Sequence, residues 1–254
     1  MKMMLSLGWL FIAIVHMAEP LISDNFTDCR DYFYKGQLPK DKRIPLYSAY
    51  ILDRRSSCKL LDDREKTFYI EPQELNGKMQ HKSALRKRGR SDTQENLERR
   101  IASSQAVNAN YKYSGYDKGH LNPRCHHETK DGQDATFTLT NVVPMPLGFN
   151  RGHWRVYENT TLYKAKECTT MYVVTGIVPG KKTIKNSHVN IPSHIWSAYC
   201  CVDNNGNLKS GAGISENKFS KSRVDEMEMN KFVNKLQGIL HTRKKFSIFQ
   251  NNCY

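Results

Sequence analysis

Acidic residues are scarce in this sequence. The 254 residues hold 25 Asp and Glu against 39 Lys and Arg, which gives a formal net charge of +14 and an isoelectric point near 9.4. The chain also lacks repeats, low-complexity tracts and, beyond its first twenty residues, any long apolar run. Hydrophobic residues still make up 39%, so the composition excludes a disordered chain, a collagen and a coiled-coil rod. The positive charge favours a polyanionic partner such as nucleic acid, a heparin-like glycan or an anionic membrane.

The start of the chain is typical of a secretory leader. Lys2 supplies a positive charge, the stretch 5–15 is almost entirely apolar, and the small residue Ala18 follows. We therefore predict a signal peptide at residues 1–18, whose removal leaves a soluble, secreted protein. A signal anchor is the alternative, but this apolar run is shorter than the roughly 20 residues that span a bilayer.

Seven cysteines follow this leader, and none has the CxxC spacing of a zinc site. In an exported protein their use as structural disulfides is favoured, although spacing alone leaves the pairing open. Adjacent strand residues point to opposite faces, so Cys200 and Cys201 need different partners if a strand carries them. Two glycosylation sequons, at Asn25 and Asn159, fit the same compartment.

The hydrophobic pattern predicts one mixed α+β domain over residues 24–254, built on a mainly antiparallel sheet with flanking helices. Strands are expected at 44–51, 67–70, 137–143 (ended by Pro144), 171–178, 195–202 and 208–214. Helices are expected at 93–109, at 148–164, and after a capping box formed by Ser222 and Asp225. The stripe of that last helix is expected to face the core and comprises Met229, Phe232, Val233, Leu236 and Leu240.

The segment 116–123 compresses titratable side chains around a glycine. Asp117, Lys118 and His120 lie within four positions, where the backbone is free to bend at Gly119. Alone this tetrapeptide is weak evidence, because a single histidine is more often a surface or core residue than a catalyst.

Two further blocks follow this segment in order. Residues 138–144 read Thr-Leu-Thr-Asn-Val-Val-Pro, and residues 149–154 read Phe-Asn-Arg-Gly-His-Trp, with Glu158 after them. The ordered set resembles the DNA/RNA non-specific endonuclease family, whose signature is Asp-Arg-Gly-His followed by a helix that bears an asparagine. Further runs resemble its vertebrate secreted branch, the endonuclease domain-containing 1 proteins, and they lie at 105–108, 174–179 and 191–196.

The resemblance implies a ββα-metal (His-Me finger) nuclease fold, in which two strands and a helix enclose one divalent metal. His120 matches the general base that removes a proton from water, a task that suits an imidazole at neutral pH. Asn150 matches the single protein ligand to Mg²⁺, for which Mn²⁺ is a candidate substitute. Asn141 and Glu158 match positions that orient metal waters or substrate, and Asp117 matches a residue that positions the histidine loop.

Helical geometry agrees with a shared site for Asn150 and Glu158. At about 100° per residue, eight positions separate the two side chains by some 80° around a regular helix. Asn159, which carries the second sequon, would then point away from Asn150. The alternative for Asn150 is an N-terminal helix cap, a position that asparagine also favours.

The sequence departs from the family at several positions. Lys118 replaces the family's arginine, which keeps the charge but loses bidentate contact with phosphate. Leu162 replaces an arginine that bacterial members carry one turn after Glu158. The basic stretch 78–90 fits a solvated loop and a phosphate-contacting loop equally well. It holds three candidates for the family's upstream phosphate-binding arginine: Arg86, Arg88 and Arg90.

The run Cys125-His126-His127 offers metal-ligating side chains outside these blocks. Adjacent residues rarely share one metal ion, so we expect a surface loop here and not a zinc site.

Two functions of different classes remain. The first is a secreted, Mg²⁺-dependent, sequence-tolerant endonuclease that hydrolyses phosphodiester bonds of DNA, with RNA as a further candidate substrate, and leaves 5′-phosphate ends. The second is a catalytically silent polyanion-binding protein that keeps the fold. Lys118 favours the second, whereas His120, Asn141, Asn150 and Glu158 favour the first.

Overall fold

The structure is a computed structural model that describes residues 35–37, 42–56, 68–70, 99, 101–219, 222–243, 246–249 and 253. The predicted leader, the sequon at Asn25 and the candidate arginines Arg86, Arg88 and Arg90 lie outside the described residues. Within the described part, no helix is both long and apolar enough to cross a bilayer.

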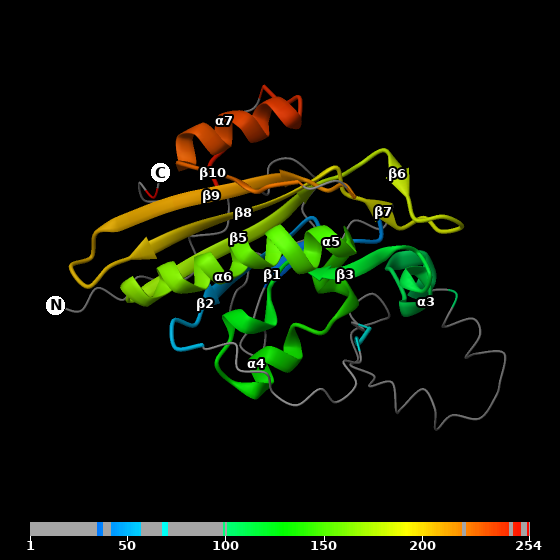
Figure 1. The fold of residues 1–254 in the computed structure, drawn as a ribbon, viewed down its shortest axis with the longest axis horizontal. Coiled ribbons are helices and arrows are strands. Elements are labelled where there is room, and N and C mark those ends of the chain that lie inside the picture. The colour runs from blue at the N-terminus through cyan, green and yellow to red at the C-terminus, as the bar shows by residue number, and fades with distance from the viewer. Residues whose placement is uncertain are drawn as a thin grey trace.

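A six-stranded sheet forms the centre of the fold (Figure 1). Its strands, in spatial order, are β1 (Lys35–Gln37), β2 (Tyr47–Leu52), β5 (Thr170–Val178), β8 (His194–Val202), β9 (Leu208–Glu216) and β10 (Asp225–Met227). All neighbouring strands run antiparallel. The predicted α+β class is therefore confirmed, and so are the predicted strands at 44–51, 171–178, 195–202 and 208–214, to within a few residues at their ends.

Helices cover both faces of this sheet. On one face lies α7 (Met229–Ile239), which buries Met229, Phe232 and Leu236 as the predicted stripe requires. Its Phe232 ring lies 5.6 Å from the ring of Trp196 on β8. The helix begins at Met229 with Glu228 as its cap, and Ser222 lies six residues upstream of that cap, before β10, so the predicted capping box is wrong.

The opposite face carries a second, two-stranded sheet and the helical segment that follows it (Figure 1). β3 (Tyr116–His120) pairs antiparallel with β4 (Val142–Pro146), with His120 opposite Val142 and Lys118 opposite Pro144. The prediction that Pro144 ends a strand is wrong, because β4 pairs only with β3 among the described strands and an edge strand accommodates proline. The predicted start at residue 137 is also wrong, since a 3₁₀ turn, η6 (Leu139–Asn141), precedes β4.

A helical run with a kink at Gly152 leaves β4 without a loop. It consists of α5 (Leu147–Phe149), the π-helical turn η7 (Asn150–Trp154) and α6 (Arg155–Lys164), which confirms the predicted helix at 148–164. Tyr157 of this run donates a hydrogen bond from its hydroxyl to the Ser197 carbonyl of β8 at 3.0 Å. The two strands and the helix thus form one ββα unit that is fastened to the main sheet.

The remaining elements are short. They are η5 (Arg124–His126), α3 (Asn108–Tyr111), α4 (Lys130–Ala135), η8 (Ala165–Glu167), β6 (Lys182–Thr183) and β7 (Asn190–Ile191). Residues 101–104 are helical, as predicted for the stretch 93–109, but that helix stops before α3. In place of the strand predicted at 67–70, a single bridge joins Tyr69 to Thr138.

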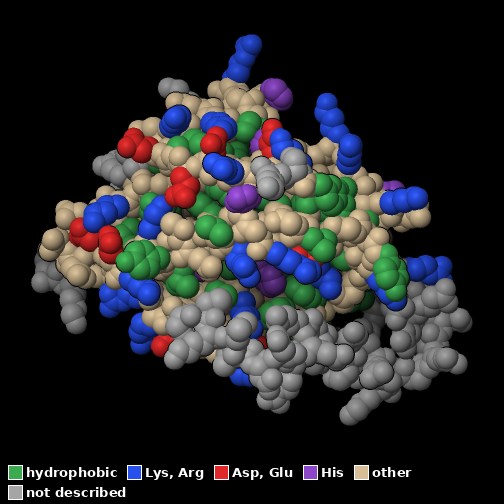
Figure 2. Space-filling model, viewed as in Figure 1, with side chains coloured by type: hydrophobic (Ala, Val, Ile, Leu, Met, Phe, Trp, Pro, Cys, Tyr) green, Lys and Arg blue, Asp and Glu red, His purple; other side chains and the backbone are tan. Residues whose placement is uncertain are grey.

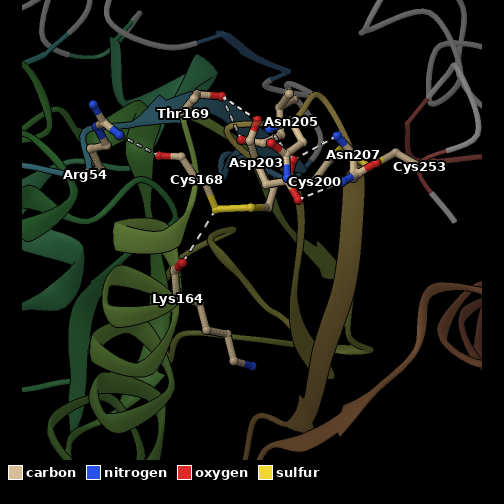
Figure 3. Close-up of a disulfide and its surroundings, with 11 residues drawn as sticks. Arg54, Lys164, Cys168, Thr169, Cys200, Asp203, Asn205, Asn207 and Cys253 are labelled. Carbon is tan, nitrogen blue, oxygen red and sulfur yellow. Dashed lines mark hydrogen bonds between the residues drawn. A yellow bond between two sulfur atoms is a disulfide. The ribbon is translucent and has the colours of Figure 1, made fainter.

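Two disulfides stem from adjacent positions of β8 (Figure 3). Cys201 is bonded to Cys168 and faces α6, while Cys200 is bonded to Cys253 and faces the α7 side. The expectation that the two neighbours take different partners is confirmed. The chain around Cys168 is held further by Arg54, whose guanidinium donates to the Cys168 carbonyl at 3.1 Å.

Candidate active site

The side chain of His120 packs against two phenyl rings at the end of β3, and the two phenyl rings also contact each other. Its ring centroid is 5.4 Å from that of Phe68 and 5.2 Å from that of Phe137, with the second contact edge-on. Phe68 reaches this place because the backbone of the next residue, Tyr69, exchanges hydrogen bonds of 2.8 Å with Phe137 and Leu139. The two rings fix the position of the imidazole, which stays partly exposed.

Lys118 lies on the same face of β3, two residues before His120. Its Nζ is 4.5 Å from the centroid of Phe68 and 6.0 Å from that of Tyr111. A cation over an aromatic face is attracted by the negative potential of the ring. The lysine that replaces the family's arginine is therefore held beside His120 by the same ring.

Gly119, between these two residues, faces the core. A Cβ atom at this position would lie 2.3 Å from the sulfur of Met145, far inside van der Waals contact. Glycine lets β3 approach the buried Met145 of β4 closely, and this close approach sets the positions of the flanking Lys118 and His120.

Asn141 lies behind β3 and not on its open side. It is fully buried, and its side-chain amide accepts from the Asn122 N–H at 3.0 Å and donates to the Asn122 carbonyl at 3.0 Å and to the Thr136 carbonyl at 2.9 Å. The expectation that Asn141 contacts substrate or metal waters does not agree with this burial. Its side chain instead holds the backbone just after His120.

His126 and His127 are buried, so the surface loop expected for them is wrong. His126 bonds through Nδ1 with the Tyr50 hydroxyl at 2.8 Å and through Nε2 with the Glu158 carbonyl at 3.1 Å, while His127 Nε2 lies 2.8 Å from Asn122 Oδ1. Burial lowers the pKa of each imidazole to about 4, so both are neutral at physiological pH. Cys125 is disulfide-bonded, and no cluster of three His, Cys, Asp or Glu side chains among the described residues could hold a metal ion.

Asn150 lies where the helical run changes from α5 to the π-helical turn. Its own backbone angles are helical, so it is not the N-cap, which is Pro146. Inside the turn, Gly152 has φ −106° and ψ −109°, which interrupts the regular helix. The predicted 80° separation of Asn150 and Glu158 is therefore wrong, because it assumed 3.6 residues per turn throughout.

The Asn150 amide is tied to β3 through Asp117. Asn150 Nδ2 donates to Asp117 Oδ2 at 3.1 Å, and Arg151 binds both carboxylate oxygens of Asp117, with Nε at 2.7 Å and Nη2 at 2.8 Å. Burial raises the pKa of Asp117, but hydrogen bonds from Arg151 and Asn150, with the charge of Arg151, outweigh it and lower the pKa below its ordinary value. Asp117 is thus an ionised acceptor, and only the nitrogen of the Asn150 amide can face it.

This arrangement fits a hard divalent cation held mainly through water. Because Nδ2 faces Asp117, Oδ1 of Asn150 is directed elsewhere, and no donor among the described residues occupies it. A neutral amide oxygen with retained waters matches the preference of Mg²⁺, which dehydrates reluctantly. An amide oxygen with an ionised carboxylate nearby offers the oxygen chemistry that a hard cation such as Mg²⁺ accepts.

Glu158 lies on α6, one residue from the exposed Asn159. Burial raises the pKa of Glu158 to about 8, against the opposing effects of Trp154 and of the charge on Arg155. The protonated side chain would ionise next to a cation, because a nearby positive charge favours the carboxylate.

The surface around this ββα unit is rich in cations. Figure 2 shows the face over α5 and β3, where Lys and Arg side chains gather with few acidic side chains between them. Arg151 belongs to this surface, with 67% of its side chain exposed even though it binds Asp117. Such a surface attracts a phosphate backbone.

Comparison with known proteins decides the family. The sequence profile described as DNA/RNA non-specific endonuclease matches residues 32–242. The chain belongs to the DNA/RNA non-specific endonuclease family. The earlier resemblance is thereby confirmed.

Several relatives of this family member are known. Human endonuclease domain-containing 1 protein is 27% identical over 98% of this chain and 53% of its own length, and the mouse protein is 30% identical over 70% of this chain and 39% of its own length. Human mitochondrial endonuclease G is 27% identical over 54% of this chain and 50% of its own length. The chain thus spans about half, or less, of the length of these relatives.

The fold agrees with this family. A crystal structure of EndoG in complex with EndoGI superposes with a TM-score of 0.56 at 18% identity, covering 79% of this chain and 80% of that one. The predicted ββα-metal fold is confirmed by this likeness and by the order β3, β4, helix.

Some residues of the site were not anticipated from the sequence. Arg151 was part of a matched block but had no assigned role, and its only sequence signal was a cation next to Asn150. Phe68 and Phe137 had no signal at all, because their contact with His120 depends on a bridge between distant segments.

Proposed function

We propose that this chain is a metal-dependent endonuclease that hydrolyses phosphodiester bonds of DNA, with RNA as a second substrate. The observation that carries the proposal is the link between Asp117 of the Asp-Lys-Gly-His strand and the Asn150 amide at 3.1 Å. This contact ties Asn150, on the helix, to the strand that bears His120, and it supports a site shared by these two elements.

His120 acts as the general base in this proposal. It takes a proton from a water molecule, and the resulting hydroxide attacks the phosphorus while the 3′ oxygen leaves, which gives a 5′-phosphate end. The rings of Phe68 and Phe137 hold the imidazole in place for this transfer. Asn150 would hold Mg²⁺, or Mn²⁺ in its place, which supplies charge stabilisation for the phosphate and the leaving oxygen when bound.

The other site residues orient neighbouring groups or bind phosphate. Asp117 orients the Asn150 amide, Asn141 supports the backbone after His120, and Lys118 supplies a positive charge for phosphate. Glu158 would ionise beside the cation and orient its waters. Arg86, Arg88 and Arg90 stay candidate phosphate ligands of the basic stretch.

Secretion is part of the same proposal. The leader at residues 1–18 and the exposed sequon at Asn159 support it, together with the disulfides Cys168–Cys201 and Cys200–Cys253. Disulfides of this kind form and persist in oxidising compartments.

A supercoiled-plasmid nicking assay tests the activity. Purified protein should nick with Mg²⁺ and not with EDTA, and Asn150→Ala should need a higher Mg²⁺ concentration for the same rate. The absence of nicking with both Mg²⁺ and Mn²⁺ would refute the proposal. EDTA should leave the circular-dichroism spectrum unchanged, because the cation is not structural.

The second candidate function is binding of polyanions without catalysis, and the position of Lys118 favours it. Its ammonium is directed over Phe68, and lysine lacks the two parallel donors with which arginine binds a phosphate. If the site is active, Lys118→Arg should keep or raise the nicking rate, by up to about 10-fold, which is about 1.4 kcal/mol. If both forms bind DNA but neither nicks, this second function replaces the first.

A further inference from the structure

Two aromatic side chains, those of Tyr116 and Phe219, form a partly exposed pair at the start of β3, and we call this pair the aromatic step. The rings of Tyr116 and Phe219 lie 5.1 Å apart at an interplanar angle of 58°. Tyr116 packs partly against the core, whereas 66% of Phe219 is exposed. Phe219 lies over the turn that precedes the strand, where a Cβ atom on Gly115 would be 3.9 Å from its ring. The core therefore fixes one ring, and that ring holds the second at the surface.

The turn next to this step presents a third aromatic ring to solvent. Tyr113 is 94% exposed, and its backbone lies in the left-handed region with φ 58°. Bulky residues seldom adopt this conformation, and such outliers gather at functional sites. Burial in the core does not explain this position, since almost none of the Tyr113 side chain is buried.

Lysines lie near these rings. Lys112 Nζ is 5.1 Å from the Tyr113 ring centroid, and Lys118 follows Tyr116 by two residues along β3. The nearest carboxylate in sequence to Phe219, that of Glu216, is paired with Lys218. Exposed aromatic rings with lysines nearby match a nucleic-acid strand, whose bases stack and whose phosphates are negative.

The position along β3 relates this step to the site of cleavage. Every second residue of a strand points to the same face, so residues 116, 118 and 120 share one face of β3. A strand rises about 3.4 Å per residue, so Tyr116 lies about 14 Å from His120. A stacked nucleic-acid strand also rises about 3.4 Å per nucleotide. A base on the aromatic step would therefore lie a few nucleotides from the phosphate at His120.

We propose that Tyr116 and Phe219, with Tyr113 beside them, form a stacking site for unpaired bases of the substrate strand. The substrate class is then nucleic acid with single-stranded character next to the cleaved bond. A paired duplex keeps its base faces covered and offers this step nothing to stack on. The inference rests on the proposed function for its ligand, but it concerns binding and not hydrolysis.

Fluorescence anisotropy in EDTA tests this site without cleavage. The probes are a short labelled single strand with bases and an abasic strand of the same length and charge. The wild-type protein should prefer the strand with bases, and Phe219→Ala should reduce its affinity for that strand by at least about 5-fold while leaving the abasic strand unchanged. Phe219→Trp should retain the preference, because it keeps an aromatic face.

A matched control is available on α6. Tyr163 is 68% exposed and also has a lysine, Lys166, near its ring at 5.5 Å, so Tyr163→Ala should change neither affinity. Equal binding of both strands by the wild type, or equal effects of the two alanine variants, would overturn the inference. A protein that nicks with Mg²⁺ but binds both strands equally refutes the stacking site alone. A protein that nicks nothing but shows the preference refutes the hydrolysis alone.

Discussion

Arg151 binds both carboxylate oxygens of Asp117, at 2.7 and 2.8 Å, from the position directly after Asn150. The pair joins the helix to β3 and keeps Asp117 ionised. An ionised Asp117 accepts from the nitrogen of the Asn150 amide, so the amide oxygen faces the other way. The orientation of the single predicted metal ligand thus depends on a salt bridge formed by its neighbour.

Removal of Arg151 should weaken metal binding. In Arg151→Ala the carboxylate of Asp117 loses the two hydrogen bonds that fix its orientation, so it can rotate away from the Asn150 amide. Loss of such an orienting partner costs about 10- to 100-fold in metal affinity. Titration with Mn²⁺ followed by electron paramagnetic resonance measures this affinity directly.

The control for this prediction is Arg243→Ala, which removes an exposed cation after α7 on the far face of the sheet. Its Mn²⁺ affinity should equal that of the wild type. An unchanged affinity in Arg151→Ala would show that the salt bridge does not orient the metal ligand.

His126 should contribute to stability without taking part in catalysis. His126→Ala leaves the buried Tyr50 hydroxyl without this partner and removes the contact with the Glu158 carbonyl. The expected loss in the free energy of unfolding is about 1–3 kcal/mol, measured by urea denaturation. The exposed His153→Ala should stay within about 0.5 kcal/mol. Equal stabilities would contradict the assigned hydrogen bonds.

Glu158 should make stability depend on pH in the absence of metal. Its pKa is raised to about 8, so between its ordinary value and pH 8 the folded state binds more protons than the unfolded state, and stability falls as pH rises. Glu158→Gln stays neutral and lacks this dependence. In urea denaturation with EDTA, the free energy of unfolding of Glu158→Gln relative to that of the wild type should therefore increase from about pH 5.5 to about pH 8.5. The exposed Glu167→Gln should show no such trend, and a parallel shift of both variants would refute the raised pKa.

Gly119 should not tolerate a side chain. In Gly119→Ala the new methyl group collides with Met145, which costs about 1–3 kcal/mol of stability, as overpacking of a core does. A Cβ atom on Gly148 meets nothing within 4 Å, so Gly148→Ala serves as the control. Thermal denaturation of both variants separates a steric cause from a general cost of losing glycine.

Local pattern predicted most of the sheet. The strands β5, β8 and β9 were recognisable because alternating or continuous runs of strand formers end at clear turns, and the opposite directions of Cys200 and Cys201 follow from strand geometry alone. The order of the three family blocks predicted the ββα unit, since each block supplies one of its elements.

Contacts between distant segments were not predictable in the same way. The π-helical turn at Asn150 depends on the backbone of Gly152, which no hydrophobic period reveals. The burial of Asn141 and His126 depends on partners such as Thr136 and Tyr50, whose positions are set by the tertiary fold. Asn141, expected to contact substrate, instead supports the backbone after β3, and His126, expected at the surface, instead joins β2 to α6.

The nicking rate of His120→Ala tests the central claim most directly. Without its general base the protein should nick supercoiled plasmid with Mg²⁺ at least about 10²-fold more slowly than the wild type. Its affinity for DNA in EDTA should stay the same, since the role proposed for His120 is proton transfer and not phosphate binding. A purified, folded His120→Ala protein that nicks at the wild-type rate would contradict the proposed active site.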